Sequence, residues 1–389
     1  MALDIERLRA DTPGCANLVH FNNAGGGLVP RPVHAAIVAH LEREMMDGVY
    51  AAAKAAEEDI HDTYVQCAAL VGAEPSEIAL TDSATRAWAL AFASVGLGPG
   101  DRVLASRSEY ASNYLSFLHL QRTLGFGIEP IPADEAGQID LEALEEALAD
   151  RHVRLVALTH VPTNSGMIQP AAAVGELTRA RGVPLLLDAC QSVGQVDLRS
   201  VQWDLLSATG RKYLRGPRGT GFLAVRSAWL DHLTPPMIDL SGAHWIGPDH
   251  YELVPGAKRF ELWERSVASV LGLRTAVRYA LELGIEPLEA RIAGLAGILR
   301  ARLEEIPGVT IQDRGARRCG LVTFTVDGVP AEMLRDRLAT ERINVSVSSA
   351  EATLLDMVDR GLDQVVRASV HAYNTEAEVD RLVSLITWG

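Results

Sequence analysis

The sequence is short of cysteine, of basic charge and of long apolar runs. Its four cysteines are far apart and none forms a CxxC pair, which argues against a disulfide framework and a zinc site. With 36 basic and 50 acidic residues the net charge is −14, and an acidic surface repels nucleic acid and anionic membranes. No stretch approaches the roughly 20 apolar residues of a membrane span, and the first residues lack a signal-peptide core. These absences predict a cytoplasmic protein without a metal, nucleic-acid or membrane partner.

The residues that are present have a globular composition, 48% hydrophobic and 22% charged over 389 residues. A single core stops growing at roughly 250–300 residues, so two lobes are expected. Buried apolar runs alternate with amphipathic helical stretches, which predicts an α/β fold: a large, mainly parallel sheet domain with helices on both faces. Shorter elements near the C-terminus predict a small α+β lobe. We place the large domain at residues 20–270 and the small one at 271–389, together with residues 1–19.

An acid and a lysine follow two apolar runs of strand length. Residues 183–187 end in Asp188, and residues 203–207 lead to Lys212. An isolated pair of this kind would be a strand-end cap and a solvated lysine. Ligands collect at the carboxyl ends of parallel strands, however, so the two side chains are expected to face one pocket. Pyridoxal phosphate (PLP) requires these two groups, an acid that keeps its ring nitrogen protonated and a lysine that forms an imine with its aldehyde.

A third strand end supplies a place for a phosphate. The strand EIALT is followed by a helix that begins near Asp82 and Ser83, and both are good N-cap residues. A helix N-terminus after a strand also presents unpaired N–H groups to an anion. The turn of Ser83, Ala84 and Thr85 therefore offers donors to a phosphate.

Two stretches carry a family resemblance. LLLDACQSVG contains Asp188 and Gln191, and SATGRKYLRGPRGTGFLAV contains Thr209 and Lys212. Together they resemble the class V aminotransferase group of fold-type I PLP enzymes, which holds cysteine desulfurases, isopenicillin N epimerase and several C–S lyases. The resemblance extends from about His20 to the last helix. It implies a fold-type I architecture in which these residues surround the cofactor.

The resemblance implies further contacts with the cofactor, and it implies that the turn of Ser83, Ala84 and Thr85 binds the cofactor phosphate. Arg211 stands where the family often has a histidine that touches the phosphate, and a guanidinium can bind a phosphate bidentately. Tyr110 stands where desulfurases place a histidine stacked on the cofactor ring, and a tyrosine can stack in its place. Thr163 corresponds to the residue beside the cofactor's phenolic oxygen.

Two residues are expected beside the substrate. Arg367, in VVRASVHAYNT, matches the family arginine whose planar fork binds the substrate α-carboxylate, a geometry that lysine lacks. Asn23 precedes a glycine triplet in the loop that passes over the active site in this family. The intact set of Asp188, Lys212 and Arg367 argues against a scaffold or regulator without catalysis.

The lack of a cysteine in one loop narrows the choice among the reactions of the family. Desulfurases of the family carry a nucleophilic cysteine in the loop that here reads SSAEATLLDMVDRGLDQ, and neither Cys190 nor Cys319 lies there. We therefore predict a C–S lyase that eliminates the sulfur group of a cysteine conjugate or sulfoxide, with Lys212 as the base. An epimerase, which needs a second proton donor such as His160 or His371, and an aminotransferase stay open as alternatives.

The segment 230–265 is rich in proline and glycine and is predicted to be irregular. Long loops inside compact enzymes are usually functional or lie at an interface. Its stretch KRFELWERS resembles a family segment that reaches the active site of the partner subunit. We therefore predict a homodimer with active sites at the interface.

Overall fold

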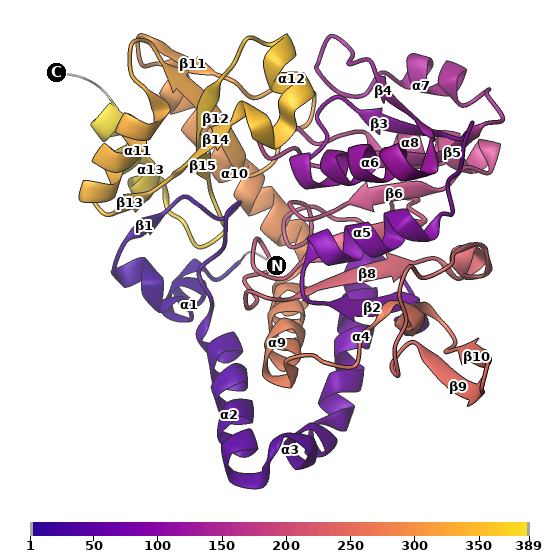
Figure 1. Cartoon of the computed structure of the whole chain (residues 1–389). Coiled ribbons are helices and arrows are strands. Elements are labelled where there is room, and N and C mark those ends of the chain that lie inside the picture. The colour runs from indigo at the N-terminus through magenta and orange to yellow at the C-terminus, as the bar shows by residue number, and fades with distance from the viewer. Residues whose placement is uncertain (1–2, 387–389) are drawn as a thin grey trace.

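A seven-stranded sheet forms the centre of the larger lobe in the computed structural model, which describes residues 3–386 (Figure 1). Strand β8 runs opposite to both of its neighbours, and the other strands pair in parallel. In spatial order the strands are β2 (Ile78–Thr81), β8 (Gly221–Val225), β7 (Leu205–Thr209), β6 (Leu185–Asp188), β5 (Val153–Thr159), β3 (Arg102–Ser106) and β4 (Gly127–Ile131). The predicted mainly parallel sheet is confirmed.

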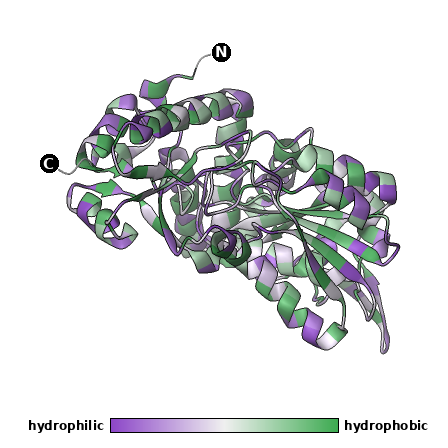
Figure 2. Cartoon of the chain, turned by 90° about the horizontal axis from the view of Figure 1, so that it is seen from above, coloured by the Kyte–Doolittle hydropathy of each residue, from purple (hydrophilic) through white to green (hydrophobic). Residues whose placement is uncertain are grey.

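Helices cover both faces of this sheet because its strands are apolar on both sides. Along β6, Leu185 and Leu187 pack into one core, and Leu186 packs into the other. Helices α7 (Leu141–Ala147) and α8 (Ala171–Arg181) contribute to the first core. Helices α5 (Ala84–Ser94) and α6 (Ala111–Leu124) contribute to the second. Figure 2 shows the sheet strands largely hydrophobic, whereas the outer helices are mixed. Burial of both faces is the usual property of parallel sheets.

The smaller lobe is an antiparallel sheet with helices, which confirms the predicted α+β lobe. Its sheet has the order β11 (Val309–Ile311), β12 (Leu321–Val326), β15 (Gln364–Ser369) and β14 (Ser346–Ser349). Its helices are α10 (Ile285–Glu304), α11 (Ala331–Thr340), α12 (Leu354–Asp359) and α13 (Glu376–Ile386). The N-terminal strand β1 (Val19–His20) pairs with β13 (Ile343–Asn344), and α1 (Ile5–Ala10) lies beside this lobe (Figure 1). The exact residue bounds of the two domains stay a prediction.

Two projections extend from the larger lobe. Helices α2 (Arg31–Asp47), α3 (Val49–Ala55) and α4 (Glu57–Val71) form a V-shaped arm, and α9 (Val267–Leu283) packs against α2 and α4 (Figure 1). The second projection is the hairpin of β9 (Ala243–Gly247) and β10 (His250–Leu253). Short 3₁₀ helices complete the chain at Pro13–Ala16, Pro75–Glu77, Ser227–His232, Ala257–Phe260 and Ala350–Thr353.

The structure of segment 230–265 differs from the irregular segment that we predict, because Gly247 to His250 form the turn of the hairpin. The predicted partner-facing stretch KRFELWERS also has a buried part and an exposed part. Phe260 is buried, and the buried Glu261 accepts hydrogen bonds from the Leu80 N–H at 2.7 Å and the Tyr64 hydroxyl at 3.0 Å. Trp263, in contrast, is 58% exposed. The middle of this stretch is therefore buried within the protomer, and its exposed residues lie on either side, at Lys258 and from Trp263 onward.

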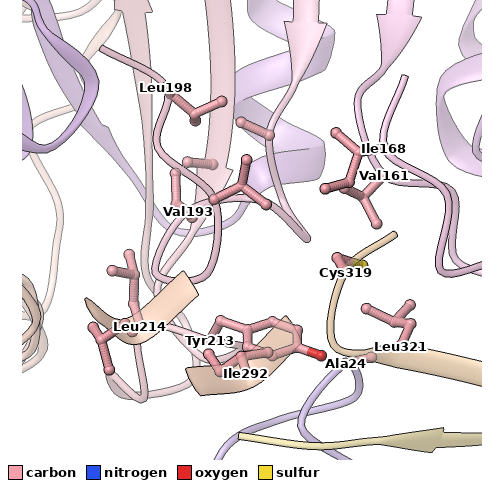
Figure 3. Close-up of a cluster of buried hydrophobic side chains, with 14 of the residues drawn as sticks. Ala24, Val161, Ile168, Val193, Leu198, Tyr213, Leu214, Ile292, Cys319 and Leu321 are labelled. Carbon is pink, nitrogen blue, oxygen red and sulfur yellow. The ribbon is translucent and has the colours of Figure 1, made fainter. Parts of the chain in front are cut away.

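The two lobes share one apolar core below the carboxyl edge of the large sheet. Figure 3 shows Val161 and Ile168 of the larger lobe opposite Cys319 and Leu321 of the smaller lobe, with Tyr213 beside them. Tyr213 directly follows Lys212 in the chain, so this core holds the backbone of the predicted catalytic lysine. In residues 3–386 no helix is both long enough and apolar enough to cross a bilayer.

Candidate active site

The carboxyl ends of three neighbouring strands build the site. Thr159 of β5 is in register with Asp188 of β6, and Asp188 is in register with Ser207 of β7. Lys212 comes shortly after the end of β7 at Thr209. Parallel sheets bind their ligands at this edge. Two adjoining cavities lie here, which we name the inner cavity and the outer cavity.

The inner cavity brings together all residues that the sequence predicts at the cofactor. Its lining comes from the start of α5, the loop before α6 and the ends of β5, β6 and β7. The lining residues are Ser83, Ala84, Thr85, Tyr110, Thr159, Val161, Thr163, Asp188, Cys190, Gln191, Thr209, Arg211 and Lys212. The prediction lacks Thr159, Val161 and Cys190, although their place at predicted strand ends was an available signal.

The start of α5 offers open donors to an anion. Ser83 caps the helix by accepting from the Arg86 N–H at 3.2 Å. The N–H groups of Ala84 and Thr85 belong to the first turn, which has no intrahelical acceptors for them. Gly221 of β8 lies so close that an added Cβ would be 3.0 Å from the Ala84 nitrogen. The cavity therefore ends at a helix N-terminus, a geometry suited to a phosphate.

Three more lining residues are tied to nearby carbonyl groups. Arg211 donates through Nη1 to the Gly25 carbonyl, and Thr209 donates through its hydroxyl to the Thr220 carbonyl at 3.3 Å. Gln191 donates through Nε2 to the Ala24 carbonyl at 3.2 Å, but its buried Oε1 has no partner in the described chain. Because buried polar atoms are almost always hydrogen-bonded, this amide indicates a ligand with a matching polar group.

Asp188 belongs to a buried hydrogen-bond network that the sequence analysis did not detect. Its Oδ1 accepts from the Cys190 N–H at 2.8 Å, and its Oδ2 accepts from Asn113 Nδ2 at 2.9 Å. The same Nδ2 donates to Glu109 Oε1 at 2.9 Å. Glu109 also accepts from the N–H and the hydroxyl of Thr159, at 3.0 and 2.5 Å. One amide thus joins two buried carboxyl groups and fixes the orientation of Asp188.

Replacing Glu109 by glutamine is expected to remove a pH dependence of stability. Burial raises the pKa of Glu109 to about 7, and the charge of Asp188 adds to the effect. An acid with a raised folded-state pKa contributes stability at low pH that is lost as the pH rises through about 7. From about pH 5 to about pH 8, the unfolding free energy of the wild-type apoprotein should therefore fall on the order of 3 kcal/mol more than that of the variant.

Urea unfolding of the two apoproteins at both pH values measures this difference. Glu252→Gln is the matched control, because Glu252 is exposed on β10. The control should keep the wild-type pH dependence. Parallel stability curves for wild type and Glu109→Gln would show that Glu109 does not titrate in this range.

Lys212 lines both cavities and has an environment that favours its neutral amine. Burial lowers the pKa of its ammonium group, and the positive charges of Arg211 and Arg367 lower it further. The nearby Cys190 and Asp188 oppose this shift. A neutral amine is the form that attacks an aldehyde or takes up a proton.

Arg367 is held at the wall of the outer cavity by hydroxyl groups. Its Nη1 donates to the hydroxyl of Thr163, and its Nε donates to Ser346 Oγ at 3.1 Å. Burial lowers its pKa to about 10, so the guanidinium stays charged at neutral pH. It has no carboxylate partner in the described residues, although buried charges are normally paired. A buried, oriented and unpaired guanidinium can receive a carboxylate from a ligand.

Asn23 lies behind the cavity wall and lines neither cavity. Its Nδ2 donates to the carbonyl groups of Ser369 at 2.7 Å and His20 at 3.2 Å, and its Oδ1 accepts from the Tyr373 hydroxyl. These bonds use the donors and acceptor of the amide and join the N-terminal loop to β15. The adjacent Ala24 and the triplet Gly25–Gly27 line the outer cavity instead.

The two histidines considered as proton donors are buried and line neither cavity. His160 is bonded through Nδ1 to the Ser192 hydroxyl at 2.8 Å, and His371 is bonded through Nε2 to the Tyr213 carbonyl at 3.0 Å. Burial lowers the pKa of both imidazoles to about 3, so both are neutral near pH 7. Their positions indicate structural roles.

The donor set of the inner cavity fits PLP. An acid, a lysine with a lowered pKa, a helix N-terminus and a buried amide without a full set of partners line one cavity. These groups match the ring nitrogen, the aldehyde, the phosphate and the phenolic oxygen of the cofactor.

Comparison with known proteins gives the same result. The chain matches the family Aminotransferase class-V over residues 19–382. The chain belongs to this family. A probable cysteine desulfurase of Pyrococcus abyssi is 27% identical over 98% of this chain and 96% of the relative. A probable hercynylcysteine sulfoxide lyase of Mycobacterium tuberculosis is 30% identical over 96% of this chain and 91% of the relative.

A solved structure of the same fold supports the assignment of fold and cofactor. The apo structure of a cysteine desulfurase from Thermococcus onnurineus NA1 has a TM-score of 0.91 to this chain at 26% identity, covering 99% of this chain and 98% of that one. The protein is a PLP-dependent class V enzyme, which confirms the predicted fold type and cofactor. The roles of single residues and the reaction are proposals.

Proposed function

We propose that this class V enzyme is a C–S lyase that acts on a cysteine conjugate or cysteine sulfoxide. The observation that carries the proposal is the lack of a thiol where a desulfurase needs one. The segment between β14 and β15 contains no cysteine and contributes Ala352 to the outer cavity. A desulfurase forms the persulfide on its own cysteine, which must act as the nucleophile at the substrate sulfur, whereas elimination requires only a base and a leaving group.

The cysteines elsewhere are unsuited to that role. Cys190 lines the inner cavity beside Asp188, and burial raises the pKa of its thiol well above the usual value. Cys319 is buried in the core shared by the lobes, where burial raises the pKa of its thiol to about 12. Both thiols stay protonated near neutral pH and are weak nucleophiles. The absence of a suitable thiol favours the activity named for the mycobacterial relative over that named for the archaeal one.

The side chains divide the work of elimination. When bound, PLP supplies an electron sink that makes the substrate Cα proton removable. Arg367 binds the α-carboxylate, and Thr163 and Ser346 hold its guanidinium in place. Lys212 takes the Cα proton as the Cβ–S bond breaks and its electron pair leaves with sulfur. A thioether thus gives a thiol and a sulfoxide gives a sulfenic acid, and addition of one water to the remaining fragment yields pyruvate and ammonia.

An epimerase and an aminotransferase, the two alternative functions, need groups or a second substrate for which this site gives less support. An epimerase returns a proton to the opposite face of Cα, but His160 and His371 line neither cavity. Tyr110 is the remaining hydroxyl candidate, and we assign it to stacking on the cofactor ring. An aminotransferase needs a keto-acid partner, which the sequence does not specify.

A substrate panel in heavy water tests the proposal. Purified holoenzyme is incubated with cysteine thioethers, cysteine sulfoxides and ordinary amino acids, and pyruvate, ammonia and the chirality of recovered substrate are measured. We expect equal amounts of pyruvate and ammonia from at least one sulfur substrate. Deuterium at Cα with inverted chirality and no pyruvate would establish an epimerase. A keto acid formed without ammonia, and only when a second 2-keto acid is added as amino acceptor, would establish an aminotransferase.

We also propose that the enzyme works as a homodimer in the cytoplasm. Met45, Met46 and Tyr50 on the arm and Trp245 on the hairpin are each more than 70% exposed. Large apolar side chains exposed on two projections are typical of protein contacts, and a second copy is the partner that the family resemblance implies. Light scattering that gave an active monomer would contradict the dimer.

A further inference from the structure

The outer cavity is large and its charged lining is entirely basic. Its volume is about 550 Å³, within the roughly 300–1,000 Å³ range of cavities that hold drug-sized ligands. Arg211, Lys212, Arg218 and Arg367 line it, and no described Asp or Glu does. Such a cavity has room for a bulky group on the substrate sulfur and favours negative charge in that group.

Three of the four cations already have a role at the site. Arg367 is held by Thr163 and Ser346 as the receptor for the α-carboxylate, Lys212 is the base, and Arg211 is bonded to the Gly25 carbonyl. Arg218 is exposed at the mouth of the cavity and makes no hydrogen bond or ion pair in residues 3–386. It is the cation of the outer cavity that remains available.

The backbone presents Arg218 at a defined place. The loop between β7 and β8 is bonded to Gly210 on both sides of Arg218. The Gly216 N–H donates to the Gly210 carbonyl at 2.8 Å, and the Gly210 N–H donates to the Thr220 carbonyl at 3.0 Å. Gly219 turns the chain with a φ of 80°. Since Gly210 precedes Lys212 by two positions, the base of the Arg218 side chain is fixed relative to the catalytic lysine.

We propose that Arg218 binds a second anionic group of the substrate, carried by the part that leaves with sulfur. The substrate class is then a cysteine conjugate or sulfoxide whose sulfur substituent bears a carboxylate or a similar anion, because a guanidinium forks onto such a group. The placement of this anion on the group that leaves with sulfur rests on the proposed lyase function. The binding site itself can be tested without turnover.

The first experiment measures binding to the holoenzyme by calorimetry. The ligands are amino acids without a leaving group, in acid and neutral amide pairs of increasing length: aspartate and asparagine, glutamate and glutamine, 2-aminoadipate and its side-chain amide. We expect the acid of one length to bind at least about tenfold more tightly than its amide, the usual value of a charge-assisted hydrogen bond. Arg218→Gln should abolish this ratio and leave the affinity of the amide unchanged.

Arg318→Gln is the matched control, since Arg318 is exposed and lines neither cavity. The control should keep the wild-type acid-to-amide ratio. Equal affinities for acid and amide at every length in the wild type, or a ratio that survives in Arg218→Gln, would overturn the proposal.

The second experiment separates this inference from the lyase proposal. Pyruvate release is compared for S-(2-carboxyethyl)cysteine and its neutral amide, S-(2-carbamoylethyl)cysteine, and for the sulfoxides of both. A higher kcat/KM for the acids, lost in Arg218→Gln, supports both proposals. If no conjugate yields pyruvate while the acid-to-amide binding ratio persists, the lyase is wrong and the anion site stands. If all yield pyruvate equally well, the lyase stands and the anion site is wrong.

Discussion

Lys212→Ala is expected to lower kcat by at least about a thousandfold, since a positioned base alone contributes roughly 10²–10⁴-fold. The variant should also lose the yellow absorption of the lysine-bound cofactor, because no other amine can replace it. The chain has three lysines, and Lys54 and Lys258 line neither cavity. Borohydride reduction of the wild-type holoenzyme, followed by peptide mass spectrometry, should place the cofactor mass on the peptide that contains Lys212.

Lys54→Ala is the control for this experiment, since Lys54 is exposed on the arm. It should keep both the yellow absorption and the wild-type turnover. A Lys212→Ala protein that stayed yellow and active would remove Lys212 from the site. A colourless wild-type protein that failed to bind added PLP would contradict the cofactor-binding role of the whole inner cavity.

Arg367→Lys is expected to lower kcat/KM for amino-acid substrates about tenfold to a hundredfold, mainly through KM. The wild-type guanidinium is oriented by Thr163 and Ser346 and lies at the wall of the outer cavity. A lysine ammonium keeps the charge but cannot form the same fork to a carboxylate. The base and the cofactor contacts are untouched, so kcat should change less than KM.

Steady-state kinetics with the best substrate of the panel measure the two constants. Arg318→Lys serves as the matched replacement outside the cavities and should leave both constants at wild-type values. An unchanged KM in Arg367→Lys would remove the α-carboxylate role from this residue. A fall in kcat alone would instead point to a part in the chemical step.

Several features of the fold and the site followed from local sequence. Residues 183–187, which lead to Asp188, are apolar at every position, as a strand covered on both faces requires. The expectation that Asp188 and Lys212 share a pocket came from the rule that parallel strands present their ends at one edge. Ser83, as a good N-cap residue, predicted the start of a helix, and the first residues of that helix line the same cavity. The hairpin at residues 243–253 was not predicted. Its turn at Gly247–His250 lies in a segment rich in proline and glycine, a composition that also fits an irregular loop.

Other features depend on segments that are distant in the chain, and only the tertiary structure decides them. Local patterns predict strands but not their order, so nothing in the sequence places Thr159 beside Asp188 or joins Asp188 to Glu109 through Asn113. The amide of Asn23 is hydrogen-bonded to Ser369 and Tyr373, which lie far along the chain, and neither composition nor motif reveals such contacts.

Local sequence therefore predicted most of the elements and the cofactor, and it singled out an acid and a lysine for the site, because each of these depends on a short pattern or on the chemistry of one residue type. The tertiary structure decided which cations have a carboxylate partner and which face a cavity without one in the described residues, as with Arg367 and Arg218. Pairing is a property of three-dimensional neighbours, and it leaves a charge free to bind a ligand only where the fold supplies no partner of its own.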